Sequence, residues 1–301
     1  MVRILMLDLG DTLANDHGVF PHVPDALKAI SSFETVAGER LTMCLISDYR
    51  MPATPGEIDV LFEEYLNHLE QLGLRAFFEP VARCVTLSTH AGVRKPARRI
   101  FETAIERLGM AASLKECLFI TENAQHIAVC KSYAMQTLQF GPVGASGVDF
   151  SDWSEAPLLV AHIVTPGNRR NLEVALNTRL AVREHLRLLS LEPGTTADRI
   201  YGRAKVWHPV HGQQLGAADG VHVELTISIT IRLDARGRIE AVERGAPAQE
   251  ELAEATHFVA TLAANQQIGF SPGPLPPGTT HEAEVDAEGR RLLKRKRFSA
   301  L

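Results

Sequence analysis

Short apolar runs alternate with amphipathic stretches over roughly the first 140 residues. The apolar runs predict strands, and stretches in which apolar residues recur every three or four positions predict helices. The predicted strands are Val2–Leu7, Thr42–Ile46, Cys84–Ser88, Cys117–Ile120 and Gln136–Phe140. The predicted helices are Val23–Ser32, Glu57–Leu72, Arg98–Leu108 and Ala124–Tyr133. This alternation predicts a parallel sheet covered by helices on both faces.

The second half of the chain has a different pattern. Val221–Leu233 alternates apolar and polar residues without a break, as expected for an antiparallel strand with one buried face. A turn at Gly237 would lead into a partner strand, Ile239–Arg244. Helices are expected near 168–189 and 247–267, and a final hairpin is expected to turn at 286–289 after a Pro- and Gly-rich loop at 271–278.

These patterns divide the chain into three parts. Residues 1–142 are expected to form an α/β domain with a Rossmann-like, doubly wound parallel sheet. The Gly-, Ser- and Asp-rich start of 143–166 indicates a linker. Residues 167–301 are expected to form a smaller α+β domain with antiparallel strands. The length of 301 residues also favours two domains.

Composition narrows the class of protein. The chain is 45% hydrophobic and 22% charged, which is typical of a soluble globular protein. A formal net charge of -5 argues against a general nucleic-acid binder. The four cysteines form no C-x-x-C pair, and their apolar surroundings predict buried thiols rather than disulfides or a zinc site. Neither a signal peptide nor a membrane span is expected, which points to the cytoplasm.

Four short motifs stand in a fixed order along the predicted α/β domain. The run ILMLDLGDTL ends a strand at Asp8, and CLISD ends another at Ser47. GVRKP places Lys95 before a helix, and LFITENAQH follows a strand with Glu122. Together they resemble the four motifs of the haloacid dehalogenase (HAD) superfamily, over residues 1–142. We recognise no family for the C-terminal domain.

The resemblance implies a chemistry for these residues. Asp8 would be the nucleophile that forms an aspartyl-phosphate. Lys95 would neutralise the transferring phosphoryl group, and Ser47 would hydrogen-bond one of its oxygens. Mg²⁺ would be held by Asp8, the backbone carbonyl of Gly10 and Glu122. In parallel sheets ligands bind at the carboxyl ends of the strands, which is where Asp8, Ser47 and Glu122 are expected.

The chain departs from the family pattern at several positions. The usual second aspartate, a general acid/base, is replaced by Gly10, and such a loss costs on the order of 10²–10⁴-fold in rate. Asp11 is the neighbouring carboxylate that could substitute for it. The usual Gly-Asp of motif four is Thr121-Glu122, and the later aspartate is His126. These changes put metal affinity and turnover in question.

Only 39 positions separate Asp8 from Ser47, so the resemblance is to members without a large cap. An open site of this kind suits bulky or macromolecular phosphate substrates, unless another part of the chain covers it. The insertion Tyr49–Pro80 and the C-terminal domain are the candidates for that cover.

Several residues also have a purely structural interpretation. Ser47 suits a turn, Glu122 suits a helix N-terminus, and His126 suits a solvated helix face. His208 and His211 have no acidic or cysteine neighbour to complete a metal site. The basic run Arg290–Phe298 suits an edge strand, with a patch for a phosphorylated or nucleic-acid ligand as the alternative.

The leading hypothesis is a Mg²⁺-dependent phosphatase whose C-terminal domain selects a phosphorylated substrate. The alternative is a catalytically degenerate HAD domain that senses a phosphate ligand or mediates protein interaction. That interaction could be homo-oligomerisation through the C-terminal domain. Dehalogenation and carbon–phosphorus cleavage form a third option, although those enzymes commonly rely on a cap.

Overall fold

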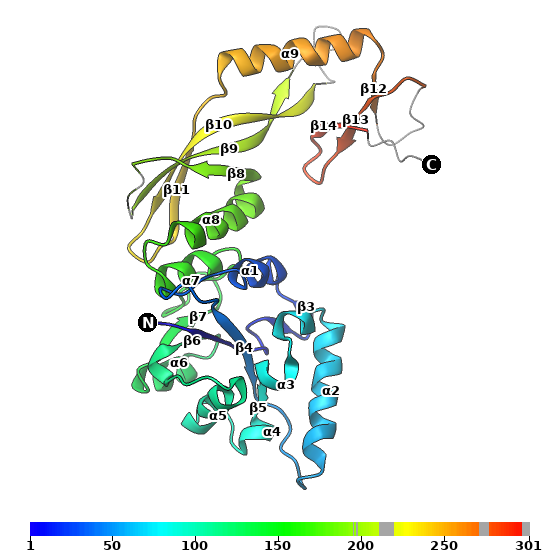
Figure 1. The fold of residues 1–301 in the computed structure, drawn as a ribbon. Coiled ribbons are helices and arrows are strands. Elements are labelled where there is room, and N and C mark those ends of the chain that lie inside the picture. The colour runs from blue at the N-terminus through cyan, green and yellow to red at the C-terminus, as the bar shows by residue number, and fades with distance from the viewer. Residues whose placement is uncertain (195, 197, 211–219, 271–276, 297–301) are drawn as a thin grey trace. The chain divides into compact units, whose positions relative to one another are not determined.

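A computed structural model describes residues 1–194, 196, 198–210, 220–270 and 277–296. The chain forms two compact units (Figure 1). Unit 1 comprises Met1–Arg183 with Arg236–Arg238, and unit 2 comprises Glu184–Ala235 with Ile239–Leu301. Each unit is described separately.

Unit 1 is built on a five-stranded, wholly parallel sheet in the order β5-β4-β1-β6-β7. Its strands are β1 (Ile4–Leu7), β4 (Thr42–Ser47), β5 (Val85–Leu87), β6 (Cys117–Thr121) and β7 (Gln136–Gln139). Except in the edge strand β7, their side chains are almost all buried, as expected when helices cover both faces of a parallel sheet. The predicted α/β class with a parallel sheet is therefore confirmed for this unit.

Six helices of unit 1 lie between its strands in sequence, and two more follow its last strand, β7 (Figure 1). They are α1 (Val23–Ile30), α2 (Glu57–Gln71), α3 (Val81–Cys84), α4 (Ser88–Ala91), α5 (Arg98–Leu108), α6 (Ala124–Ser132), α7 (Ala156–Val164) and α8 (Arg169–Glu184). A short hairpin, β2 (Ala14–Asn15) and β3 (Gly18–Val19), and two 3₁₀ turns, Arg75–Phe78 and Leu114–Glu116, complete the unit.

The apolar stripe of α5 explains its place in the core. Ile100, Phe101 and Ala104 pack with Ile4 and Phe119 of the sheet in one buried cluster. The helix stops at Gly109, whose φ of +67° is a left-handed conformation that glycine adopts without strain. The sequence pattern therefore fixes both the buried face and the end of this helix.

The structure differs from the predicted domain boundaries of 142 and 167. The segment 143–166 contains the wholly buried Trp153 and the helix α7, and α7 packs against α1 within unit 1. The compact units divide after Arg183, one residue before the end of α8 at Glu184. The predicted linker is thus part of the first unit, because its apolar residues complete that core.

Unit 2 contains a seven-stranded, mainly antiparallel sheet among its described residues. Its elements are β8 (Leu186–Leu191), β9 (Arg199–Val210), β10 (Val221–Leu233), β11 (Ile239–Arg244), α9 (Gln249–Ala264), β12 (Ile268–Phe270), β13 (His281–Val285) and β14 (Arg291–Arg295). The strand β10 has the predicted bounds and alternates buried and exposed residues along its length. The predicted β11 partner and the final hairpin are also present, although part of the loop at 271–278 lies outside the described residues.

Two features of unit 2 depart from the sequence prediction. The helix expected over 168–189 ends at Glu184, and Leu186–Leu191 is a strand instead. The strand β9 was not predicted, yet it pairs with β10 over twelve residues, from Arg199 to Val210. The class is nevertheless the expected one, a separate α+β part rich in antiparallel strands.

The cysteine prediction can be compared directly with the structure. All four cysteines are free thiols, and three of them are buried. Burial raises the pKa of Cys117 and of Cys130 to about 12, which keeps both thiols protonated. In the described residues no helix is long and apolar enough to cross a membrane.

Candidate active site

The parallel register brings the predicted site residues to one edge of the sheet. Asp8 follows the central strand β1, which pairs with β4 on one side and β6 on the other. Ser47 is the last residue of β4, and Thr121 is the last residue of β6. Three polar positions far apart in sequence therefore end up at the carboxyl edge, where α/β folds bind ligands.

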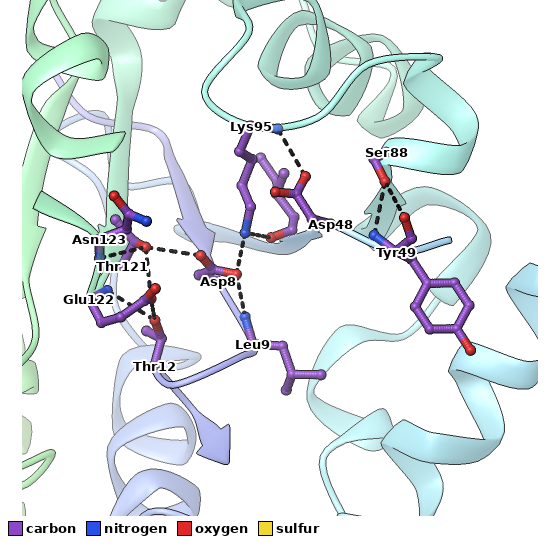
Figure 2. A network of polar contacts seen from close by, with 11 residues as sticks. Asp8, Leu9, Thr12, Asp48, Tyr49, Ser88, Lys95, Thr121, Glu122 and Asn123 are labelled. Atoms are coloured by element: carbon purple, nitrogen blue, oxygen red, sulfur yellow. Dashed lines mark hydrogen bonds and ion pairs between the residues drawn. The ribbon is translucent and has the colours of Figure 1, made fainter. Parts of the chain in front are cut away.

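Asp8 and Lys95 form a buried ion pair at this edge (Figure 2). Their side chains are only 6% and 3% exposed, so water screens their attraction little. Oδ1 of Asp8 accepts a hydrogen bond from the Lys95 ammonium and another from the Leu9 backbone N–H at 2.9 Å. The ammonium also donates to the backbone carbonyl of Ile46 at 3.2 Å.

Asp48 holds the backbone of Lys95 in place. Its Oδ1 accepts a hydrogen bond from the Lys95 backbone N–H at 2.9 Å. Because Asp48 directly follows β4, this bond ties the loop that carries the lysine to the end of the sheet. Asp48 is a site residue to which the sequence pattern assigned no role, although it stands next to Ser47 in CLISD.

The other oxygen of Asp8 contacts the Thr121 hydroxyl, which also contacts a second carboxylate, that of Glu122 (Figure 2). Oγ1 of Thr121 lies 2.9 Å from Oδ2 of Asp8 and 3.0 Å from Oε2 of Glu122. A hydroxyl has one proton to donate, so Thr121 can satisfy only one of the two carboxylates at a time. Oε2 of Glu122 also accepts a hydrogen bond from the Thr12 hydroxyl at 2.6 Å.

Glu122 is held at the start of α6 by its neighbours. The Asn123 side chain caps the helix by accepting hydrogen bonds from two backbone N–H groups, those of Gln125 and His126. The Glu122 backbone N–H donates to the Thr12 hydroxyl at 3.1 Å. Thr12 is in turn fixed by Trp153, whose indole N–H donates to the Thr12 carbonyl at 2.8 Å. Hydrogen bonds from Glu122 and Trp153 to Thr12 therefore hold the loop that follows Asp8.

Asp11, the predicted substitute acid, lies apart from this network. It is exposed, has a left-handed φ of 52°, and its backbone N–H donates to the Ala14 carbonyl. Gly10, also exposed, has open space around the position where a Cβ would be. In the described residues no hydrogen bond or ion pair joins the Asp11 carboxylate to Asp8, whose polar partners are Leu9, Lys95 and Thr121.

His126 lies near the charged groups of the site. Burial lowers its pKa, the Lys95 charge lowers it further, and three carboxylates (Asp8, Asp48 and Glu122) act in the opposite direction. Its Nδ1 atom is buried without a hydrogen-bond partner in the described part of the chain. The ring is therefore neutral at neutral pH, and the structure places it closer to the site than a solvated helix face would.

The oxygen ligands at this edge suit Mg²⁺. Proteins bind Mg²⁺ through one or two carboxylates together with waters and substrate phosphates. The carboxylates of Asp8 and Glu122 both reach the same Thr121 hydroxyl, so they converge on one small region. The described residues include no group of three or more His, Cys, Asp or Glu side chains placed for a metal ion. The carboxylates of Asp8 and Glu122 are the predicted metal ligands that the structure brings together, and the Gly10 carbonyl as a third ligand stays a prediction.

The site is more enclosed than the sequence spacing indicated. Asp8, Ser47 and Lys95 are all buried, at 4%, 6% and 8% exposure. The insertion predicted as one candidate cover supplies Tyr65 of α2, which is buried and packs against Tyr49, two residues after Ser47. The expectation of an open site is therefore not met, because residues of unit 1 itself enclose the charged pair.

The remaining candidate motifs lie in unit 2. The His208 ring contacts the neighbouring Pro209 carbonyl, and His211 lies outside the described residues. In the basic run, Arg290 pairs with Asp286 and Glu288, while Lys294 pairs with Glu284 across the hairpin. The end of the run, 297–298, is also outside the described residues. The strand β14 (Arg291–Arg295) pairs with β13 on one side and with β10 on the other, so the edge-strand interpretation of this run is wrong.

Comparison with known proteins gives distant structural likenesses only. No protein-family model and no curated protein matches the chain. An uncharacterized protein from Corynebacterium glutamicum is 16% identical, with a TM-score of 0.32, over 47% of this chain and 87% of that one. YfnB from Bacillus subtilis, a candidate HAD hydrolase crystallised with magnesium, is 15% identical, with a TM-score of 0.37, over 50% of this chain and 57% of that one.

Proposed function

We propose that unit 1 is a HAD-like phosphatase that hydrolyses phosphate monoesters through an aspartyl-phosphate on Asp8. The observation that carries this proposal is the buried Asp8–Lys95 ion pair at the carboxyl edge of a parallel sheet. The order of the four motifs along the chain supports it. Because the site residues are buried, the proposal does not include the bulky substrate that the short spacing suggested.

The reaction follows from how the side chains are held. Leu9 and Lys95 fix one oxygen of Asp8, which orients the carboxylate for attack on phosphorus. A bond forms between Asp8 and phosphorus while the ester P–O bond breaks, and the alcohol leaves after taking a proton from water. A second water then attacks the aspartyl-phosphate, which releases inorganic phosphate and restores the carboxylate. Lys95 and Ser47 stabilise the negative charge on the phosphoryl oxygens during both steps.

Asp8, Glu122 and the Gly10 carbonyl would hold Mg²⁺. The ion would supply charge neutralisation that lets two anions, the carboxylate and the phosphoryl group, approach each other. In this chain Thr12 and Thr121 keep the Glu122 carboxylate beside Asp8. Their hydrogen bonds must rearrange when an ion binds, since Oε2 of Glu122 faces both hydroxyls.

The proposal is tested by release of inorganic phosphate from a panel of monoesters in the presence and absence of Mg²⁺. We expect Asp8→Asn to lower turnover by on the order of 10³-fold or more. This variant also leaves Lys95 uncompensated, which destabilises the fold by about 3–5 kcal/mol, so its melting curve must be recorded. Ser47→Ala keeps the ion pair and should lower turnover by about 10²-fold.

Asp11→Asn is the matched control for Asp8→Asn. Asparagine tolerates the left-handed backbone at position 11, and the side chain is exposed, so turnover should stay within about threefold of wild type. Turnover that persists in a folded Asp8→Asn protein would contradict the proposed nucleophile.

A second candidate function is a phosphate-binding module without turnover. It is favoured by Gly10 in place of an acid and by the Thr121 hydroxyl between the two carboxylates. Calorimetry separates the two candidates. Phosphate binding without hydrolysis of any monoester supports the module, and the absence of both Mg²⁺ and phosphate binding contradicts both functions.

A further inference from the structure

The helix α2 brings a tyrosine to the same edge of the sheet as Ser47. Tyr65 lies on the buried face of α2 and is 2% exposed. Its ring packs edge-on against Tyr49, with the ring centroids 5.2 Å apart. Tyr49 is itself fixed, because its backbone N–H donates to the Ser88 hydroxyl at 2.9 Å. The position of the Tyr65 hydroxyl is therefore set by two packed elements.

The Tyr65 hydroxyl is buried and makes no hydrogen bond of normal geometry in the described part of the chain. Burial raises the pKa of this phenol well above its ordinary value; the neighbouring Ser47 hydroxyl lowers it and the Asp8 charge raises it. The phenol therefore remains protonated and is a hydrogen-bond donor. A buried donor without a partner is unfavourable, so a state that supplies a partner is favoured.

We infer that Tyr65 is a positioning residue that orients the Ser47 hydroxyl toward a phosphoryl group bound beside Asp8. A serine hydroxyl rotates freely and has a single proton. When Tyr65 donates to Ser47 Oγ, the serine proton must point elsewhere and becomes available to a phosphoryl oxygen. This inference rests on the proposed function, because it assigns Tyr65 a part in binding phosphate at that site.

Calorimetric titration of the whole protein with inorganic phosphate in the presence of Mg²⁺ tests the inference. Tyr65→Phe keeps the ring and removes the donor, and should raise the phosphate Kd by about tenfold, the effect of one charge-assisted hydrogen bond. Its melting temperature should be equal to or above that of wild type, because an unpaired buried hydroxyl is lost. A residue with only a structural role would not combine these two changes.

A double-mutant cycle with Ser47→Ala shows whether Tyr65 acts through Ser47. In the Ser47→Ala background, Tyr65→Phe should cause no further loss of affinity. Tyr201→Phe, the same substitution on strand β9 of unit 2, should leave the Kd unchanged.

Each remaining outcome has a distinct meaning. A wild-type Kd that Tyr65→Phe does not change overturns the inference and leaves the proposed function standing. The same loss of affinity in both backgrounds shows that Tyr65 acts independently of Ser47, which also overturns the inference. A wild-type protein that binds no phosphate contradicts the proposed function itself, and the role of Tyr65 fails with it.

Discussion

At the scale of single residues, the Thr121 hydroxyl has an unusual position between two carboxylates. Asp8 and Glu122 would repel each other if both were ionised with nothing between them. Lys95 compensates Asp8 from one side, and the Thr121 proton lies within reach of both carboxylates on the other. A bound cation would likewise reduce the repulsion between the two carboxylates. Thr121 is therefore expected to compete with metal binding.

Replacing Thr121 with alanine tests this competition. Without the hydroxyl the two carboxylates lose a shared donor, so we expect the Mg²⁺ Kd to fall by about fivefold to tenfold. In the absence of Mg²⁺ the variant should be less stable by about 1–2 kcal/mol. Calorimetry and chemical denaturation measure the two effects.

Thr121→Ser is the control for this experiment, because it retains a hydroxyl at the same place. Its Mg²⁺ affinity should resemble that of wild type. Equal Mg²⁺ affinities for the alanine variant and wild type would mean that the hydroxyl does not compete with the ion.

At the scale of elements, the segment predicted as a linker supports the site. Trp153 is fully buried and contacts Phe140 and Phe150, with ring centroids 5.9 and 5.3 Å away. Its indole N–H reaches the Thr12 carbonyl, 141 positions earlier in the chain. A local sequence pattern cannot reveal a bond over that separation, which is why the segment was interpreted as a connection.

Trp153→Phe should weaken the support of Thr12. The substitution keeps an aromatic ring but leaves the buried carbonyl without its donor, which costs about 1–3 kcal/mol of unfolding free energy. Denaturant unfolding measures this loss. Trp207→Phe on β9, where the ring is only half-buried, should cost less. Equal losses in the two variants would argue against a special role for the indole N–H.

The junction of β5 and α4 predicts a pH dependence. The Leu87 backbone N–H donates to Nδ1 of His90 at 3.1 Å, which requires a neutral ring. Burial first and the Arg107 charge second lower the pKa of His90 from 6.5 to about 4, while Asp59 raises it. The folded state thus binds its proton less readily than the unfolded state. Its stabilising contribution is complete above pH 6.5 and is lost as the pH falls toward 4.

His90→Gln keeps an acceptor near Leu87 and removes the titration. Urea unfolding between about pH 7 and pH 4.5 should therefore show a steeper loss of stability for wild type than for the variant. Above pH 6.5, the ordinary pKa of histidine, the unfolding free energies of the two proteins should change with pH at the same rate. Parallel curves over the whole range would show that His90 does not titrate with unfolding.

The elements also show what the sequence could and could not predict. The five parallel strands were predicted from their short apolar runs, and β10 was predicted from its regular alternation of apolar and polar residues. The helix α7 was missed because Ala156–Val164 is buried almost all round and has no polar face to mark its period. The strand β9 was missed because its burial alternates only at its start, near Gly202. The positions of Asp8 and Ser47 at the carboxyl ends of strands could be predicted from the sequence. The positions of Tyr65 and Trp153 depend on tertiary contacts, which a local pattern does not show.

At the scale of the whole molecule, the candidate site belongs to unit 1 alone. Every hydrogen bond described around Asp8, Lys95 and Glu122 comes from residues before position 184. Unit 2 contains a separate hydrophobic cluster, which includes Val221, Val259 and Leu293. The expected division of roles between the units, with phosphate binding by unit 1 and substrate selection by unit 2, stays a prediction.

A chain that ends at Arg183 tests this division. It retains the parallel sheet, Trp153 and all residues of the site, and loses from unit 1 only Arg236–Arg238. The Arg236–Asp149 ion pair that disappears is partly exposed, so its loss should cost little. We expect the shortened chain to fold and to bind inorganic phosphate within about threefold of the whole protein, measured by calorimetry.

The same comparison shows what unit 2 contributes. Across a panel of monoesters, the shortened chain should lose the preference that the whole protein shows among substrates while its phosphate Kd stays the same. This result follows if selectivity depends on contacts away from the phosphoryl group, which unit 2 would supply. An identical substrate ranking for the two chains would place selectivity within unit 1. Loss of phosphate binding by a folded shortened chain would mean that the site needs residues beyond Arg183, because the network around Asp8 would then be insufficient alone.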